Sequence, residues 1–319
     1  MKLRVASRSP AGMNVVRFIL EDRNGQALPP FAPGDHIELT FNDENGEYIR
    51  RSYSLTNTCS QDASPQFYEI GILRNEEGLG GSRWLHAHLS EGSFVEVSAP
   101  RSHFPMDDRA EHRILIAGGI GITPILSMAR ACDRSQLPYE LYFFCRSEDD
   151  APFIADVRAL LGQSLHIHAG MEPDKVRTRL TEILRSPSSQ ATVHVCGPSG
   201  LIGATTETAH ELAWEKHRIR FERFAPEKSA TDHAFTAILG SGQTIEVGAQ
   251  ETLLHALQRE GISVMSSCGA GNCGACLVVV LEGEVEHRDT VLSAEEKAEN
   301  AVMCCCVSRA KGNSIVIEV

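Results

Sequence analysis

The sequence predicts a multidomain protein with an antiparallel β-barrel, an α/β domain built on a doubly wound parallel sheet, and a smaller α+β domain. Three observations support this prediction. Residues 1–106 hold short β-type runs separated by turn dipeptides, which is typical of a barrel. Over 107–226, strands alternate with helices, which indicates a parallel sheet covered on both faces. Residues 234–319 hold a glycine-rich loop with several cysteines, and a length of 319 residues suits two or three domains.

Composition and charge limit the possible partners. The chain has 30 basic and 42 acidic residues, a net charge of −12. This balance argues against nucleic acid or an anionic membrane as the main partner, because both attract basic surfaces. No apolar run approaches the roughly 18 residues of a spanning helix, and Met1–Val5 lacks the apolar core of a signal peptide. We therefore expect a soluble, cytoplasmic protein with no membrane or nucleic-acid partner. We also expect it to be a monomer.

In the first zone, the β-type runs are separated by turns and one helix. The runs are His36–Phe41, Phe67–Leu73 and Phe94–Ser98. Asn24-Gly25 and Asn45-Gly46 are turn dipeptides. A helix is expected from an N-cap at Ser82 through Leu89.

In the second zone, the strand Ile114–Ala117 leads into a glycine loop and then a helix. Thr123 is expected to cap that helix, with Pro124 at its first position. Further strands are expected at Glu140–Cys145 and Val193–Cys196. Further helices are expected near 153–161, 178–185 and 200–214.

A polar stretch without periodicity, 225–233, is expected to link the second and third zones. The third zone opens with a hairpin over Phe235–Val247. A helix near 251–260, ended by Gly261, follows it. The zone closes on a strand over Ser314–Val319.

Six of the ten cysteines lie in the last 52 residues, and this lopsided placement is unlike a disulfide scaffold. Cys268, Cys273 and Cys276 have the spacing Cys-x4-Cys-x2-Cys of plant-type 2Fe–2S clusters. Three thiolates can converge from one short loop only if its backbone coils tightly. The intervening glycines at 269, 271 and 274 permit the positive φ angles that coiling requires. A structural zinc site and unligated core thiols are the alternatives, although zinc sites usually pair two Cys-x2-Cys knuckles.

The fourth ligand must come from elsewhere in the chain. The cysteine loop resembles the plant-type ferredoxin family, and the spacing of that family's third and fourth ligands points from Cys276 to Cys306. The resemblance therefore implies Cys306 as the fourth ligand. Cys304 and Cys305 are then spare or buried thiols.

The glycine loop of the second zone has the context of a dinucleotide site. Gly118, Gly119 and Gly121 follow a strand and open a helix, where bare backbone and a helix N-terminus suit a pyrophosphate. Pro124 stands where the fingerprint has its third glycine, so an ordinary tight turn is the alternative. The strand that ends at Cys196 is expected to deliver its carboxyl end to the same edge, where ligands of such sheets bind.

Gly-Gly-Ile-Gly-Ile-Thr-Pro followed by Cys196-Gly197-Pro198 resembles the ferredoxin–NADP reductase superfamily. The resemblance implies that Thr123 lies near flavin and nicotinamide, and that Cys196 lies beside the nicotinamide ring. A buried, inert Cys196 is the alternative. Near the expected adenosine ribose, Arg146 is followed by acidic residues at 148, 149 and 150, which favours NADH over a nucleotide with a 2′-phosphate.

A flavin site is implied by the same superfamily pattern, Arg-x-Tyr-Ser. In it Tyr53 packs on the isoalloxazine, Arg51 contacts the phosphate, and Ser54 bonds near the reactive nitrogen. The expected flavin contacts in the first zone are Arg51, Ser52, Tyr53, Ser54, Gly80, Gly81 and Ser82. Gly80-Gly81-Ser82 adds a helix N-terminus for the phosphate. FMN is expected rather than FAD, because the barrel shows no adenosine-binding segment. By family analogy Phe224 reaches the flavin; a core role is the alternative.

Taken together, the motif order resembles the phthalate dioxygenase reductase family over essentially all 319 residues. The resemblance implies an FMN-binding barrel over 1–106, an NAD-binding domain over 107–226 and a ferredoxin-like β-grasp domain over 234–319. It also implies that electrons pass from NADH through FMN and 2Fe–2S to a Rieske-type oxygenase, with Ser54, Thr123 and Cys196 at the hydride-transfer centre. A stand-alone NADH:acceptor flavin reductase or diaphorase is one alternative. A non-enzymatic metal-binding scaffold is another.

Overall fold

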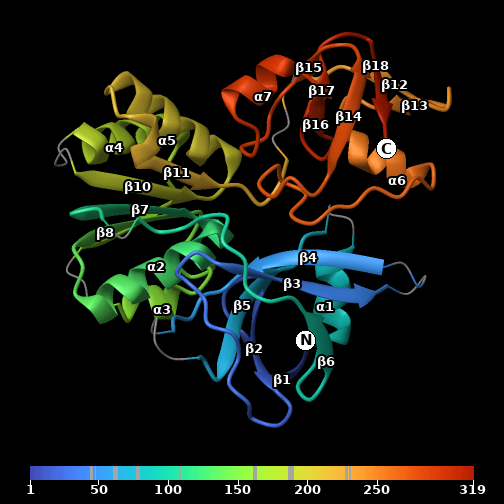
Figure 1. Cartoon of the computed structure of the whole chain (residues 1–319). Helices are drawn as coiled ribbons and strands as arrows, with labels where there is room; N and C mark the ends of the chain where they lie inside the picture. Colours follow the sequence, from blue (N-terminus) through green and yellow to red (C-terminus); the bar gives the residue numbers. More distant parts are fainter. Residues whose placement is uncertain are drawn as a thin grey trace. The chain divides into compact units, whose positions relative to one another are not determined.

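The computed structural model describes the chain except residues 44, 45, 47, 60–63, 77–79, 108, 161–163, 186–189, 227, 228 and 230. The described residues form two compact units, Met1–Glu222 and Arg223–Val319 (Figure 1). The first unit contains an antiparallel and a parallel sheet. The second contains a five-stranded sheet and a small two-stranded one. The prediction of a multidomain fold with these sheet types is confirmed.

The antiparallel sheet has the strand order β4-β3-β6-β1-β2-β5. Its strands are β1 (Lys2–Pro10), β2 (Val15–Asp22), β3 (His36–Asn42), β4 (Tyr48–Ser54), β5 (Phe67–Leu73) and β6 (Phe94–Val97). An antiparallel bridge between Leu55 and Ile70 joins the two edges, so the sheet closes into a barrel. Alternate side chains such as Ile37 and Leu39 fill its interior. The expected turn at Asn45-Gly46 includes Asn45, which lies outside the described residues.

The helix α1 (Gly81–His88) follows β5, and its start differs from the prediction. Its N-cap is Gly80, at φ 83°, so Ser82 lies inside the first turn and does not cap. The Ser82 hydroxyl instead accepts a hydrogen bond from the Asn75 N–H at 3.0 Å. A left-handed residue turns the chain into the helix here, and glycine adopts that conformation at little cost.

The parallel sheet has the strand order β11-β10-β7-β8-β9. Its strands are β7 (His112–Gly118), β8 (Tyr139–Cys145), β9 (Leu165–Ala169), β10 (Ala191–Cys196) and β11 (Ile219–Glu222). Its helices are α2 (Ile122–Ser135), α3 (Ile154–Arg158), α4 (Pro173–Arg185) and α5 (Ser199–Glu211). Leu115 packs with α2 and α3, whereas Ile114 and Ile116 pack with α4 and α5 on the other face (Figure 1). The doubly wound arrangement is confirmed, with α4 beginning earlier and α5 ending earlier than expected.

The start of α2 also corrects a prediction. A 3-10 turn, Gly119–Gly121, runs directly into the helix, so Gly121 is its N-cap and Thr123 and Pro124 lie within the first turn. The Thr123 hydroxyl donates to the Ile120 carbonyl at 3.0 Å and is buried. Pro124 is still tolerated, because N–H groups of the first turn have no partner within the helix.

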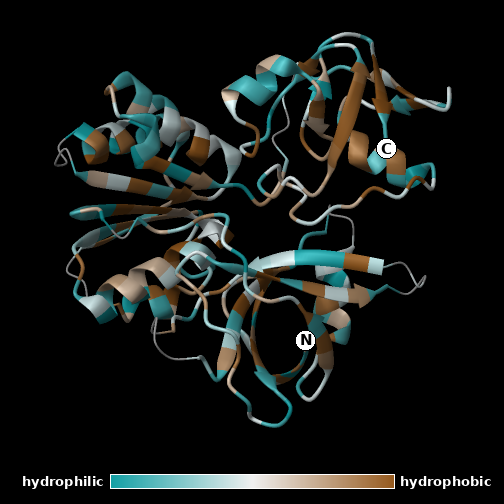
Figure 2. Cartoon of the chain, viewed as in Figure 1, coloured by the Kyte–Doolittle hydropathy of each residue, from teal (hydrophilic) through white to brown (hydrophobic). Residues whose placement is uncertain are grey.

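The second unit has a mixed sheet of order β13-β12-β18-β14-β16. Its strands are β12 (Phe235–Leu239), β13 (Thr244–Val247), β14 (Leu277–Glu282), β16 (Val302–Cys304) and β18 (Ser314–Glu318), and β15 (Val285–Glu286) pairs with β17 (Arg309–Ala310). Its helices are α6 (Leu253–Arg259) and α7 (Ala294–Glu299). The expected hairpin is confirmed as β12 and β13, and α6 packs against the sheet in one core. In Figure 2 β14 is an almost unbroken hydrophobic strand.

No helix among the described residues is long and apolar enough to cross a membrane.

Candidate functional site

The glycine loop after β7 and the turn after β10 meet backbone to backbone. A Cβ on Gly121 would lie 2.6 Å from the Gly197 nitrogen and closer still to the Cys196 carbonyl. A Cβ on Gly197 would lie 2.9 Å from the Gly118 Cα. These positions therefore exclude any side chain. Because β7 and β10 are adjacent parallel strands, the bare backbones lie at the carboxyl edge of the sheet, together with the N-terminus of α2.

A buried carboxyl group accompanies Cys196 at this edge. Glu222, the last residue of β11, pairs in register with Cys196, and both are buried. The Glu222 Oε2 atom has no hydrogen-bond partner among the described residues. Burial raises the pKa of Glu222 to about 8. Burial, and then the nearby Glu222 carboxyl, raises the pKa of the Cys196 thiol.

Glu222 was not among the residues predicted from sequence. An acidic residue at the end of the strand Ile219–Glu222 was the available signal. The functional significance of Glu222 depends on the pairing of its strand with β10, and the sequence alone does not identify that pairing. A buried carboxyl group whose Oε2 atom has no partner among the described residues, beside the expected nicotinamide position, is suited to contact a bound polar group.

Thr123 lies where the barrel meets the parallel-sheet domain. A Cβ on Gly71 of β5 would lie 2.5 Å from the Phe153 ring and 3.2 Å from the Thr123 methyl group. The barrel strand therefore packs closely on the first turn of α2. Thr123 therefore lies at the boundary of the two sheets, and its place near both cofactors stays a prediction.

Arg51 lies against the first turn of α1. A Cβ on Gly81 would approach the Arg51 Nε to 2.8 Å, so glycine makes room for the guanidinium. Arg51 Nη1 donates to the Arg50 carbonyl at 2.8 Å. Burial lowers the pKa of Arg51, because it disfavours the charged form. A guanidinium beside a helix N-terminus forms a cationic site that fits a phosphate group.

The remaining residues of the Arg-x-Tyr-Ser pattern lie along β4. Tyr53 pairs with Ile37 and packs on the barrel core, and burial raises the pKa of its hydroxyl. Ser52 points to the other face of the strand, and its buried hydroxyl has no partner among the described residues. Ser54 ends the strand and is 5% exposed. The orphaned Ser52 hydroxyl fits a site that a bound polar group completes.

Arg146 and the acidic residues after it follow β8, so they lie at the same carboxyl edge as the glycine loop. Arg146, Asp149 and Asp150 are exposed. Glu148 pairs with Arg158 at 2.5 Å. Two exposed carboxylates therefore remain near the expected ribose position.

The cysteine loop of the second unit has the backbone that the spacing predicted. Gly269, Gly271 and Gly274 have φ angles of 64°, 76° and 71°. The Cys268 sulfur accepts hydrogen bonds from the N–H groups of Ala270 at 3.4 Å and Asn272 at 3.3 Å. The loop thus coils around its sulfur atoms and directs amides at them, as a cluster-binding loop does.

The thiols of the loop and of residues 304–306 interact with one another. Cys268 hydrogen-bonds Cys273, while Cys276 accepts hydrogen bonds from Cys304, Cys305 and Cys306, all three of them buried. These hydrogen bonds lower the pKa of Cys276 and raise the pKa of the three donors. Within the described ranges, no three His, Cys, Asp or Glu side chains surround one position suited to a single metal ion.

Cys306, the predicted fourth ligand, lies close to two cysteines of the loop. Besides its bond to Cys276, its sulfur accepts a hydrogen bond from the Gly271 N–H and lies under the electrostatic influence of Cys268. Cys304, the last residue of β16, lies under the electrostatic influence of Cys276 and Cys273, and the Cys305 N–H donates to the Cys276 carbonyl at 3.2 Å. The cysteines therefore fit a 2Fe–2S cluster, and Cys306 as its fourth ligand stays a prediction.

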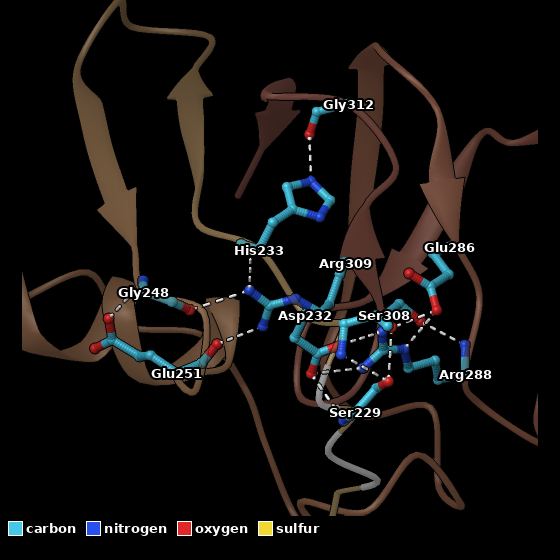
Figure 3. A network of polar contacts seen from close by, with 11 residues as sticks. Ser229, Asp232, His233, Gly248, Glu251, Glu286, Arg288, Ser308, Arg309 and Gly312 are labelled. Atoms are coloured by element: carbon cyan, nitrogen blue, oxygen red, sulfur yellow. Dashed lines mark hydrogen bonds and ion pairs between the residues drawn. The ribbon is translucent and has the colours of Figure 1, made fainter.

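A polar network within the second unit joins Asp232 and Arg288 to Ser308, two residues after Cys306 (Figure 3). Arg288 holds Asp232 through two hydrogen bonds of 2.6 and 3.1 Å, and its N–H donates to the Ser308 hydroxyl at 3.2 Å. Ser308 in turn donates to buried Asp289 at 3.4 Å. Asp232 belongs to the expected linker 225–233, so part of that stretch is bound to the second unit.

Phe224 lies at the start of the second unit and is 43% exposed. Its expected contact with flavin stays a prediction.

Comparison with known proteins agrees with this site. Residues 236–311 match the family model of the 2Fe-2S iron-sulfur cluster binding domain. The chain is 35% identical over 305 residues to the vanillate O-demethylase oxidoreductase of Acinetobacter baylyi, covering 95% of this chain and 93% of that protein. It is 38% identical over 319 residues to a putative toluene-4-sulfonate monooxygenase system reductase subunit of Comamonas testosteroni, covering 99% and 98%.

Among solved structures, phthalate dioxygenase reductase matches with a TM-score of 0.74 and 33% identity, covering 100% of this chain and 98% of that one. That structure is described as modular, for electron transfer from pyridine nucleotides to 2Fe–2S. Fold and site together define an iron–sulfur oxidoreductase with a nucleotide-binding parallel sheet. The chain belongs to the phthalate dioxygenase reductase-like family, and the resemblance drawn from its motifs is confirmed.

Proposed function

We propose that the chain is the NADH-dependent reductase component of a two-component Rieske-type oxygenase. Electrons pass from NADH to FMN, then to a 2Fe–2S cluster, then to the oxygenase. The observation that carries the proposal is the match along nearly the whole chain to oxidoreductase subunits of oxygenase systems. The oxygenase partner, rather than this chain, then determines the substrate that is hydroxylated or demethylated.

When bound, FMN and the cluster convert a two-electron hydride donor into single-electron steps. The chain's own residues bind and orient them. Arg51 and the N-terminus of α1 bind the flavin phosphate, with Gly81 as the position that leaves room. Tyr53 covers the ring, and the hydroxyl of Ser54 orients its reactive edge. Ser52, Gly80 and Ser82 complete the flavin contacts.

The nucleotide occupies the carboxyl edge of the parallel sheet. Gly118, Gly119 and Gly121 present their backbones to the pyrophosphate, and Gly197 and Pro198 line the opposite side. Thr123 and Cys196 are compact and buried, so they exclude water from the nicotinamide. Arg146 contacts the ribose region, where Asp149 and Asp150 repel a 2′-phosphate and favour NADH.

Cys268, Cys273, Cys276 and Cys306 are the proposed cluster ligands. Residues 234–319 carry 5 basic and 11 acidic residues, a net charge of −6. An acidic carrier domain favours an oxygenase with a basic docking patch. We propose a cytoplasmic protein that acts as a monomer, with no membrane or nucleic-acid partner.

The test begins with the purified protein. The flavin released on denaturation is identified by chromatography, and iron and acid-labile sulfide are assayed. NADH should reduce flavin and cluster without oxygen, and a Rieske oxygenase added in stoichiometric amount should then be reduced. Absence of flavin or iron would refute the cofactor assignment. Rapid reduction of dyes with no reduction of any oxygenase would favour the stand-alone diaphorase.

A further inference from the structure

Four charged side chains form a closed ring at the boundary between the two sheets of the first unit. Arg17 of β2 and Glu69 of β5 come from the barrel, and Arg130 of α2 and Asp156 of α3 come from the parallel-sheet domain. Each domain thus contributes one cation and one carboxylate. The ion pairs Glu69–Arg130 and Arg17–Asp156 cross the boundary.

The charged groups of the ring lie close to one another and are largely shielded from water. Arg130 Nη1 lies 2.8 Å from Glu69 Oε1, and its Nη2 lies 2.6 Å from Asp156 Oδ1. Arg17 pairs with Asp156 and lies 3.8 Å from Glu69. The Glu69 side chain is 9% exposed, and that of Asp156 is 16% exposed. Loss of one arginine would leave a carboxylate poorly compensated at low dielectric, which costs more than loss of a surface pair.

The ring also holds the backbone that follows the expected flavin strand. Arg130 Nη1 donates to the Thr56 carbonyl at 2.9 Å. The Thr56 hydroxyl donates to Glu69 Oε1 at 2.5 Å, and the Thr56 N–H donates to the Glu69 carbonyl at 2.9 Å. Thr56 lies two residues after Ser54, so Arg130 is connected directly to the segment that carries the proposed flavin contact.

At its other end, the same helix carries the proposed nucleotide loop. The helix α2 begins at Ile122, directly after the 3-10 turn Gly119–Gly121, and Arg130 lies eight residues further on. That separation is about 12 Å along a rigid helix at a rise of about 1.5 Å per residue. One helix therefore fixes the place of the glycine loop relative to Thr56.

We propose that Arg130 is a positioning residue that sets the distance between nicotinamide and flavin. The inference rests on the proposed function. In the step concerned, a hydride with its electron pair leaves C4 of the nicotinamide and bonds to N5 of the flavin, so that NAD⁺ and reduced flavin are formed. Reacting atoms must be about 3–3.5 Å apart, and a misplacement of about 1 Å can cost about 100-fold in rate.

The test compares Arg130→Gln with wild type in anaerobic stopped-flow reduction by NADH. We expect the limiting rate constant of flavin reduction to fall at least about tenfold, with the apparent Kd for NADH changed less than about twofold, because geometry rather than nucleotide contact is lost. Arg130→Lys, which can hold one partner at a time, should restore part of the rate.

The matched control is Arg177→Gln. Arg177 of α4 pairs with Glu207 at 3.0 Å and Glu211 at 2.6 Å, and all three residues lie within the parallel-sheet domain. This variant also loses an arginine that holds two carboxylates, but no contact across the boundary. Its limiting rate should stay within about twofold of wild type, since exposed pairs contribute little.

A second readout needs no turnover. NAD⁺ added to the reduced wild-type protein should produce a long-wavelength charge-transfer absorption, which reports stacking of nicotinamide on flavin, and Arg130→Gln should weaken it while retaining its flavin. If Arg130→Gln does not fold, Arg130→Lys decides, and a wild-type rate and absorption in that variant overturn the proposal. Equal losses in Arg177→Gln also overturn it. A wild-type protein that NADH does not reduce refutes the proposed function instead.

Discussion

Gly121→Ala isolates the close contact between the glycine loop and the turn after β10. Gly121 has φ −61°, an angle that alanine adopts freely, so the backbone adds no strain. The added methyl group would lie 2.6 Å from the Gly197 nitrogen and nearer still to the Cys196 carbonyl. Those atoms are backbone, and they belong to a buried strand end that no rotamer change can move aside. The turn or the loop must shift.

Gly203→Ala is the control, because the same substitution should there have the opposite effect on stability. Gly203 lies inside α5, and a Cβ there would meet no atom within 4 Å. Alanine in a helix interior is favoured over glycine by about 0.5–1 kcal/mol, so Gly203→Ala should stabilise the protein. Overpacking at a buried contact typically costs about 1–3 kcal/mol, so Gly121→Ala should destabilise it.

The assay is urea unfolding of the first unit within the intact chain, followed by titration with NADH. We expect a difference of about 1.5–4 kcal/mol between the two alanine variants, and weaker NADH binding only for Gly121→Ala. A Gly121→Ala protein as stable as Gly203→Ala would show that the two loops are not in contact. Unchanged NADH affinity in a destabilised variant would show that the loop does not bind the nucleotide.

Three further predictions concern the two redox sites. Cys306→Ser should lose the visible absorption of the cluster and its iron, whereas Cys304→Ser should retain both; bleaching by Cys304→Ser alone would exchange their roles. Asp149→Arg should raise kcat/KM for NADPH relative to NADH at low salt, where charge is least screened, and an unchanged ratio would remove this loop from the ribose site. The pKa of Glu222 is raised to about 8 in the folded protein, so the unfolded chain loses this proton at lower pH than the folded protein does. The contribution of Glu222 to the free energy of unfolding therefore falls as pH rises from about 5 to about 8. The unfolding free energy of Glu222→Gln, relative to that of wild type, should therefore increase by at least about 1 kcal/mol over this pH range. A difference that stays constant with pH would refute the raised pKa.

Features set by nearby residues were predictable from the sequence. The loop from Cys268 to Cys276 combines ligand spacing with glycines, and each of those glycines has the positive φ expected. The alternation of strands and helices indicated the doubly wound sheet, because crossover connections leave that pattern in any chain. Helix starts were less predictable. Ser82 and Thr123 are good caps by residue type, but a left-handed Gly80 and a 3-10 turn begin the two helices elsewhere.

Features that depend on pairs of residues far apart in the sequence were not predictable from it. Glu222 has significance only because β11 pairs with the strand that ends at Cys196. Likewise, Arg17 and Asp156 are 139 residues apart, and no spacing in the sequence relates them. A charged residue on a strand or helix normally faces water, so its sequence context gives no sign of a partner from another domain.

The glycine contacts within the parallel-sheet domain and the charge ring across the domain boundary have different effects on hydride transfer. The bare backbones at Gly121 and Gly197 determine where a pyrophosphate can approach within one sheet. They do not fix that sheet against the barrel, because both loops belong to the same domain. Contacts across the boundary must do this, and among the described residues Arg130 joins the helix after the glycine loop to the backbone after Ser54. Nucleotide affinity should therefore respond mainly to the glycines and the hydride-transfer rate mainly to the charge ring. Parallel losses of affinity and rate in both sets of variants would contradict this division.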